Sequence, residues 1–115
     1  MNLLNETIDA LSNSGKTRSD VRWIGSTNYG YFDWEHFVKI ANVEYDDGYG
    51  SAEVARDLVA VGDDWWLERK EYDGNEWWTF KRLPMKPQNK IEPNKITGRY
   101  DPSLRELNEK TEDWR

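Results

Sequence analysis

The sequence of 115 residues contains no cysteine and only one histidine. The absence of cysteine excludes a disulfide scaffold and every zinc site with Cys ligands, and it fits a reducing cytoplasm. No apolar run approaches the roughly 18 residues of a membrane-spanning helix. The first residues also lack the basic start and the apolar stretch of a signal peptide. We therefore expect one small cytoplasmic domain that makes no contact with a membrane.

Recognisable catalytic and metal-binding motifs are also missing. His36 lies in a predicted helix, and no serine has the motif context of a nucleophile. Gly15-Lys16-Thr17 lacks the upstream glycine of a phosphate-binding loop. Asp46-Asp47-Gly48 lacks the spacing of acids in a calcium-binding loop. The sequence therefore predicts a protein that is not an enzyme and holds no cofactor and no metal.

Charge is distributed unevenly along the chain. Residues 44–76 contain eleven acids and three bases, whereas residues 81–99 contain six bases and one acid. One interpretation is solubility combined with compensation of charge within the protein. The other is that the acidic segment meets a basic partner, such as the nucleic-acid groove of another protein. A net charge of -6 disfavours direct binding of DNA or RNA.

The pattern of apolar residues predicts the α+β class. We expect a small antiparallel sheet of three to four strands, packed by two helices, with a short C-terminal helix. The expected strands cover about residues 21–25, 57–61, 64–72 and 76–83, and the two helices cover about 3–13 and 34–45. Residues 1–84 form the domain. Residues 85–115, which contain several prolines and lysines, form an extended connector and a short helix or tail.

Local signals set the predicted ends and faces of the helices. Leu4, Ile8 and Leu11 place an apolar face on the first helix. Asp33 is a suitable N-cap for the second helix. Asp101 followed by Pro102 predicts the start of the C-terminal helix, because proline suits the first helical position.

The clearest signal is a hairpin in Asp57–Pro84, which holds four of the seven tryptophans. Asp73-Gly74 favours a two-residue turn that would place Leu67 opposite Phe80 and Arg69 opposite Trp78. A three-residue bulged loop would reverse the faces, because side chains alternate along a strand. The predicted core face carries Trp65, Leu67, Trp78 and Phe80, and the other face carries Trp66, Tyr72 and Trp77.

Three aromatic side chains on the second face are a large apolar area for a monomer to leave open. The N-terminal helix or the connector covers them, or they form an interface, since Trp and Tyr dominate binding hot spots. Stacking tryptophans beside acids would also suit a sugar. The residues that we predict to bind a partner are Trp66, Tyr72, Trp77, Asp46, Asp47, Asp63 and Asp64.

Two segments, WEHFVKIANVEYDDGYG (34–50) and DLVAVGDDWWLERKEYDGNEWWTFKRLP (57–84), carry a likeness to known proteins. This pattern resembles small uncharacterised accessory proteins from phages and prophages of Gram-positive bacteria. The likeness covers about half of the chain and transfers no site residues. It implies a protein that acts in the host cytoplasm by binding a host protein. Some phage proteins of this kind, such as anti-CRISPR proteins, place an acidic face on the nucleic-acid-binding surface of their target.

The function that we expect is therefore binding of a host protein with a basic surface, with inhibition of host antiviral defence as its narrower form. Two alternatives stay open. One is a carbohydrate- or small-ligand-binding module that uses exposed tryptophans. The other is a phage virion or assembly component whose aromatic face is buried by self-association.

Overall fold

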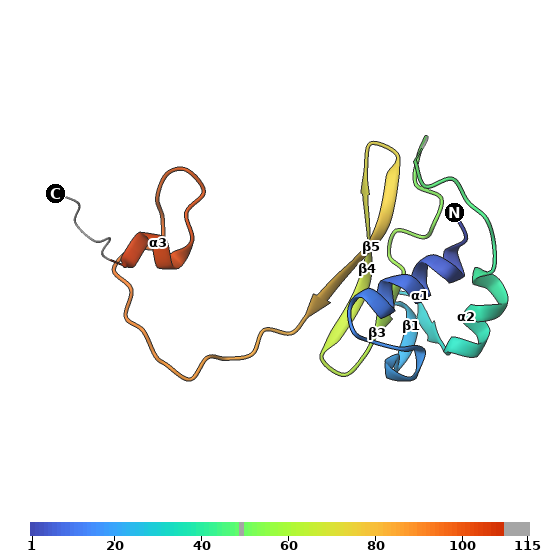
Figure 1. The fold of residues 1–115 in the computed structure, drawn as a ribbon, viewed down its shortest axis with the longest axis horizontal. Helices are drawn as coiled ribbons and strands as arrows, with labels where there is room; N and C mark the ends of the chain where they lie inside the picture. Colours follow the sequence, from blue (N-terminus) through green and yellow to red (C-terminus); the bar gives the residue numbers. More distant parts are fainter. Residues whose placement is uncertain (49, 110–115) are drawn as a thin grey trace. The chain divides into compact units, whose positions relative to one another are not determined.

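The computed structural model describes residues 1–48 and 50–109, and it divides into two units, Met1–Pro84 and Met85–Arg115. The first unit contains, in chain order, α1 (Leu3–Asn13), the 3₁₀ helix η1 (Arg18–Asp20), β1 (Trp23–Ser26), β2 (Gly30–Phe32), α2 (Trp34–Ala41), β3 (Val59–Val61), β4 (Trp65–Tyr72) and β5 (Asn75–Arg82). The second unit contains α3 (Leu104–Asn108). The α+β class is confirmed (Figure 1).

The strands form one antiparallel sheet in the order β2-β1-β3-β4-β5. The prediction of three to four strands is wrong because β2 was missed. Its residues follow Gly25–Asn28, which has the composition of a loop, and β2 is only three residues long. In the structure Gly25 and Ser26 belong to β1 and pair with Tyr31 and Gly30, and only the following residues form the turn of a β1–β2 hairpin.

The β4–β5 hairpin has the two-residue turn that Asp73-Gly74 predicts. Both residues have positive φ, 52° and 88°, as a turn matched to the twist of the strands requires. Leu67 pairs with Phe80 and Arg69 pairs with Trp78, so the predicted register is confirmed.

The core lies between the two helices and the inner face of the sheet, which we define as the face directed toward α1 and α2. Trp65, Leu67 and Trp78 of this face are buried, and Phe80 is half-buried and stacks on Trp65. They join buried residues of both helices and of β1 and β3 in one cluster: Leu3, Leu11, Phe37, Ala41, Ile24 and Ala60. The predicted core face of the hairpin is therefore confirmed.

Helix α1 has the predicted bounds but presents a different face. The buried residues are Leu3, Thr7 and Leu11, whereas Ile8, predicted to face the core, is 46% exposed. Thr7 occupies the centre of this buried face, where an apolar residue would be expected. Its hydroxyl donates to the Leu3 carbonyl (2.7 Å) and accepts from the Trp78 indole nitrogen (2.8 Å), so burial leaves the polar group satisfied.

Helix α2 ends at Ala41, four residues before the predicted end at residue 45. The following residues run beside the N-terminus instead. Leu3 donates from its backbone N–H to the Val43 carbonyl (3.1 Å), and Tyr45 donates to the Met1 carbonyl (2.9 Å). This pairing replaces the last helical turn and places the Tyr45 side chain in the core.

In the second unit, α3 begins two residues later than predicted. Ser103, not Asp101, is the N-cap, and it forms a capping box with Glu106. Asn108 holds the preceding loop, because its side-chain oxygen accepts hydrogen bonds from the backbone of Asn94 (2.8 Å) and Lys95 (2.9 Å). Within the described ranges, no helix is long and apolar enough to cross a membrane.

Candidate functional site

The outer face of the sheet, directed away from α1 and α2, is the first candidate surface. Side chains alternate along each strand, and the registers place one set of neighbours on this face: Trp23, Tyr31, Val59, Val61, Trp66, Glu68, Lys70, Tyr72, Trp77, Thr79 and Lys81. Both helices of the Met1–Pro84 unit pack on the inner face. The prediction that the N-terminal helix covers the aromatic residues is therefore wrong.

The three aromatic residues predicted to bind a partner all lie on this face. Tyr72 is 75% exposed and Trp77 is 43% exposed. Trp66 is half-buried, and its indole nitrogen donates to the Glu68 carboxylate at 2.7 Å. This hydrogen bond, with a smaller contribution from the Lys70 ammonium, lowers the pKa of Glu68 below its ordinary value. Trp66 is therefore held in place, whereas Tyr72 and Trp77 are open.

The outer face also has aromatic residues that the sequence did not single out. Trp23, Val61 and Trp66 form one row across β1, β3 and β4. Beside this row, Trp23 and Tyr31 line a surface cleft with a volume of about 520 Å³. Gly25 lies between them on the same face, where a side chain would overlap the main chain of Gly30. Alternation in residues 21–25 was the available signal for Trp23, but no signal identified Tyr31.

The four predicted acidic residues do not join the aromatic residues in one site. Asp63 and Asp64 lie at the β3–β4 turn, where Asp63 forms two hydrogen bonds with Arg22 (2.7 and 3.1 Å). These bonds lower the pKa of Asp63. Asp46 and Asp47 lie near the start of β5, where the Asp47 carbonyl accepts from the Glu76 backbone. β4 separates the two pairs by about 25 Å, at roughly 3.3 Å per residue.

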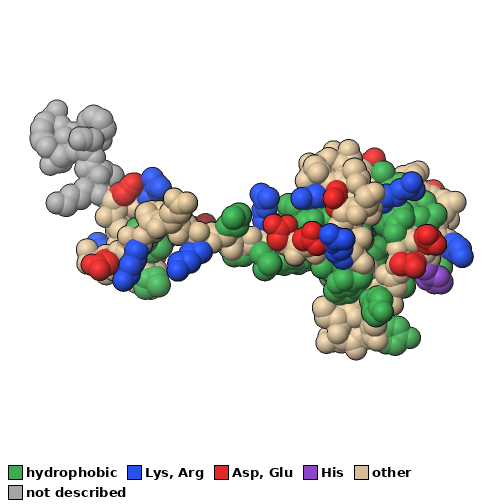
Figure 2. Space-filling model, turned by 90° about the horizontal axis from the view of Figure 1, so that it is seen from below, with side chains coloured by type: hydrophobic (Ala, Val, Ile, Leu, Met, Phe, Trp, Pro, Cys, Tyr) green, Lys and Arg blue, Asp and Glu red, His purple; other side chains and the backbone are tan. Residues whose placement is uncertain are grey.

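Charge is mixed on the side of the Met1–Pro84 unit that Figure 2 shows, where acidic and basic side chains lie close together with exposed hydrophobic side chains between them. The outer face carries one acid and two bases among its members, Glu68, Lys70 and Lys81. The four predicted acids therefore flank the aromatic face at its ends.

A buried charge cluster, formed by Glu6, Tyr45, Arg69 and Glu76, was not predicted. The Arg69 guanidinium donates to Glu6 (3.2 Å), to Glu76 (2.8 Å) and to the Tyr45 hydroxyl (3.1 Å). The Tyr45 hydroxyl in turn donates to Glu6. Arg69 also lies over the Trp78 ring, 4.8 Å from its centroid. The sequence contains no local signal for this cluster, because its members come from four separate segments.

The environment of the cluster shifts two ionisation equilibria. Burial raises the pKa of Tyr45, and so does the hydrogen bond to Glu6. Burial alone would lower the pKa of Arg69, but its bonds with Tyr45 and Glu76 raise the pKa above the ordinary value. Both groups therefore keep their protons across the physiological range. The carboxylate of Glu76 also accepts from the backbone N–H groups of Glu53 (2.7 Å) and Val54 (3.3 Å), so internal partners occupy it.

Metal ligands do not converge in the described part of the chain, where no three His, Asp or Glu side chains are placed to hold an ion. His36, the only histidine, is exposed on α2 and packs edge-on against Phe32.

The sequence matches no protein-family model, and neither a curated protein nor a solved structure is significantly similar to it. The likeness to phage accessory proteins therefore stays a prediction.

Proposed function

We propose that this chain is a non-enzymatic protein-binding module of phage or prophage origin, which uses the outer face of its sheet to bind a host protein. The observation that carries the proposal is the open outer face, where Tyr72 and Trp77 are exposed and Trp66, farther along β4, is half-buried. Aromatic residues of this kind dominate the energetics of protein interfaces. The narrower proposal is that the partner belongs to host antiviral defence, which rests on the sequence resemblance alone.

The outer face is large enough for a small interface. The strands contain 4, 3, 3, 8 and 8 residues, which at about 3.3 Å per residue and about 4.8 Å between strands give a face of about 400 Å². This is about half of the roughly 800 Å² that each partner contributes to a standard protein interface.

The acidic residues have a steering role in this proposal. Asp46 and Asp47 lie at one end of β4, and Asp63 and Asp64 lie at the other. Acids at the rim of an interface accelerate association with a basic partner and make binding sensitive to salt. They contribute less to affinity than the central aromatic residues do, because solvent screens them.

The test is capture of a host protein by purified wild-type and variant chains at about 50 mM and about 500 mM salt. The outer-face variant is Tyr72→Ser/Trp77→Ser. Its matched control is Tyr29→Ser/Tyr100→Ser, because both control residues are more than nine-tenths exposed and neither belongs to the outer face. Wild type and control should capture the same protein, more strongly at low salt, and the outer-face variant should lose it. Equal capture by the outer-face variant, or no specific capture by wild type, would refute the proposal.

A small-ligand-binding role is the second candidate, and the cleft between Trp23 and Tyr31 favours it. Trp23 and Tyr31 are the two aromatic side chains that line this cleft, on which a flat ring or a sugar could stack. Glycan and small-molecule screening by tryptophan fluorescence would test this role, with Trp23→Ala as the variant that should abolish the signal. A fluorescence response that Trp23→Ala leaves unchanged would place the ligand elsewhere.

A further inference from the structure

One edge of β5 is open over most of its length. β5 is the last strand of the sheet, so only one of its edges is paired with β4. The Glu76 N–H points away from β4 and donates to the Asp47 carbonyl (3.0 Å), whereas the Leu83 N–H donates to Asp64, which precedes β4 (2.7 Å). Backbone groups alternate along an antiparallel strand. The N–H and C=O groups of Trp78 and Phe80 therefore point to the open edge, and no described residue pairs with them.

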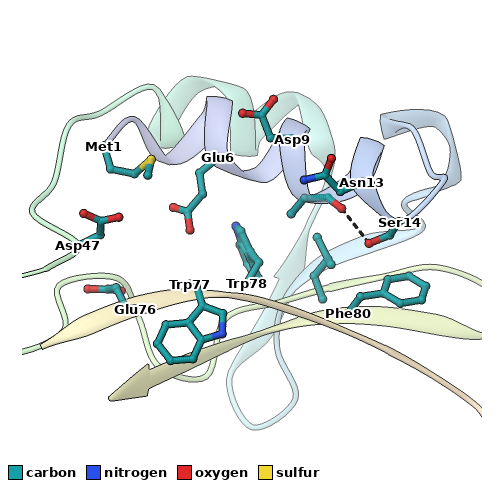
Figure 3. Close-up of a pocket in the computed structure, with 12 residues that line it drawn as sticks. Met1, Glu6, Asp9, Asn13, Ser14, Asp47, Glu76, Trp77, Trp78 and Phe80 are labelled. Atoms are coloured by element: carbon teal, nitrogen blue, oxygen red, sulfur yellow. Dashed lines mark hydrogen bonds between the residues drawn. The ribbon is translucent and has the colours of Figure 1, made fainter. Parts of the chain in front are cut away.

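A groove lies beside this edge, between β5 and α1. It has a volume of about 450 Å³. Helix α1 contributes small or polar side chains, including Ala10 and Asn13, and most of the apolar surface comes from Leu67, Trp77, Trp78 and Phe80. Figure 3 shows Trp78 rising toward α1 while Trp77 points to the other side of the strand. A strand that paired with the open edge would therefore place alternate side chains in the groove under α1.

The groove is acidic. Its charged lining side chains are all carboxylates: Glu6, Asp9, Asp47 and Glu76. Arg69 pairs with Glu6 and Glu76 from within the core, and the Met1 amino group, also nearby, pairs with Glu44. Asp9 and Asp47 have no ion-pair partner among residues 1–48 and 50–109. Even after internal pairing, the groove keeps an excess of negative charge.

We propose that the β5 edge and the α1 groove bind an extended lysine- or arginine-rich segment of a partner protein, which pairs antiparallel with β5 as a sixth strand. Backbone bonds to Trp78 and Phe80 would supply affinity, and basic side chains in the groove would supply selectivity. This surface shares only Trp77 with the outer face, and the inference does not rest on the function proposed above. A second copy of the chain is a poor occupant, because pairing two β5 edges would bring two acidic grooves together.

The experiment uses a fluorescein-labelled peptide, acetyl-Lys-Val-Lys-Val-Lys-Val-amide, and fluorescence anisotropy with the full chain. The control peptide replaces each lysine with glutamate. In an antiparallel pair, directly opposed residues share a face, so the lysines opposite Trp78 and Phe80 enter the groove and donate their N–H groups to β5. N-methylation of the lysines should weaken binding by about tenfold or more. N-methylation of the valines, whose N–H groups point to solvent, should leave binding nearly unchanged.

Protein variants test the charge requirement. Asp9→Lys/Asp47→Lys should weaken binding of the lysine peptide. The matched control Glu35→Lys/Glu92→Lys changes net charge equally at exposed positions outside the groove and should bind like wild type. Equal weakening in both variants would indicate unspecific attraction and would overturn the proposal.

Amide hydrogen exchange by NMR locates the contact. The amides of Trp78 and Phe80 should exchange more slowly with the lysine peptide present, whereas Thr79, whose N–H already points to β4, should not change. Absence of binding, binding of the glutamate peptide, or an effect of valine methylation as large as that of lysine methylation would overturn the proposal. So would slowing of the same amides by protein concentration alone, because that result would identify a second copy as the occupant. None of these outcomes depends on Tyr72 or Trp77, which test the outer face.

Discussion

Replacement of Arg69 by methionine tests whether the buried charge cluster holds the Met1–Pro84 unit together. Methionine keeps most of the length and apolar packing of arginine but removes the guanidinium. The Arg69 side chain is 3% exposed, and the carboxylates of Glu6 and Glu76 that it contacts are 12% and 2% exposed. The variant would therefore leave two carboxylates and the Tyr45 hydroxyl without their shared donor in a region that water scarcely reaches.

The expected loss is large relative to the total stability. Removing one partner of a buried ion pair typically costs about 3–5 kcal/mol. A unit of this size has a free energy of unfolding of about 4–13 kcal/mol, at roughly 0.05–0.15 kcal/mol per residue. Arg69→Met should therefore remove about a quarter or more of the stability, and it should leave the unit partly unfolded if the wild type lies at the low end.

The assay is urea unfolding at pH 7, followed by tryptophan fluorescence. Arg22→Met is the matched control, since Arg22 also forms a close pair, with Asp63, but both side chains are more than half exposed. Solvent screening should make its effect far smaller. The double variant Arg69→Met/Glu76→Met should be more stable than the sum of its two single changes predicts, by about 1–3 kcal/mol. Equal losses for Arg69→Met and Arg22→Met, or strict additivity, would refute the reasoning.

Three further outcomes are expected from single groups. The pKa of Tyr45 is raised by burial, so Tyr45 should stay protonated in an ultraviolet titration at about pH 11, where exposed tyrosines ionise. The contribution of Tyr45 to the free energy of unfolding is complete below about pH 10 and is lost as the pH rises further. The pKa of Glu68 is lowered, so its contribution is present above about pH 4.3 and is lost as pH falls through the folded-state value. Trp66→Phe should move that pKa back up in a carboxyl NMR titration. Gly25→Ala should cost at least about 2 kcal/mol in urea unfolding, because the added Cβ would overlap the Gly30 carbonyl oxygen; a near-neutral effect would show that the hairpin can shift.

The elements that could be predicted best are those in which local residue preferences agree with the final fold. The β4–β5 hairpin has alternating side chains and a turn dipeptide with one favoured geometry, so its register and both faces could be predicted. Strand β2 could not, because three residues after a glycine-containing loop carry no periodicity of their own. The predicted end of α2 was too late because Ile40 and Tyr45 continue the apolar spacing, while the backbone groups of Val43 and Tyr45 pair with residues 1–3.

The same contrast between local patterns and long-range pairing applies to the candidate site residues. Trp66, Tyr72 and Trp77 could be placed on one face because alternation is a property of a single hairpin. The four acids were grouped only by their nearness in sequence, and β4 separates them in space. Arg69 could be placed opposite Trp78, but its counterions come from residues 6 and 76, and no local pattern links α1 to β5. Long-range pairing of charges is therefore what the sequence leaves undetermined here.

β5 contributes to both proposed surfaces, and its two-residue period makes them separable. Tyr72 and Thr79 lie on the outer face only, whereas Trp78 and Phe80 line the groove and carry the open backbone groups. Trp77 lies on the outer face and also lines the groove. A substitution at Tyr72 therefore alters the outer face and leaves both the groove lining and the edge hydrogen bonds intact. The edge itself is made of backbone, and among substitutions only proline removes an N–H group from it. Proline at Trp78 or Phe80 would also remove a side chain that packs in the core, so the decisive change is made in the peptide. Loss of host-protein capture with retained peptide binding, or the reverse, would assign each activity to one surface.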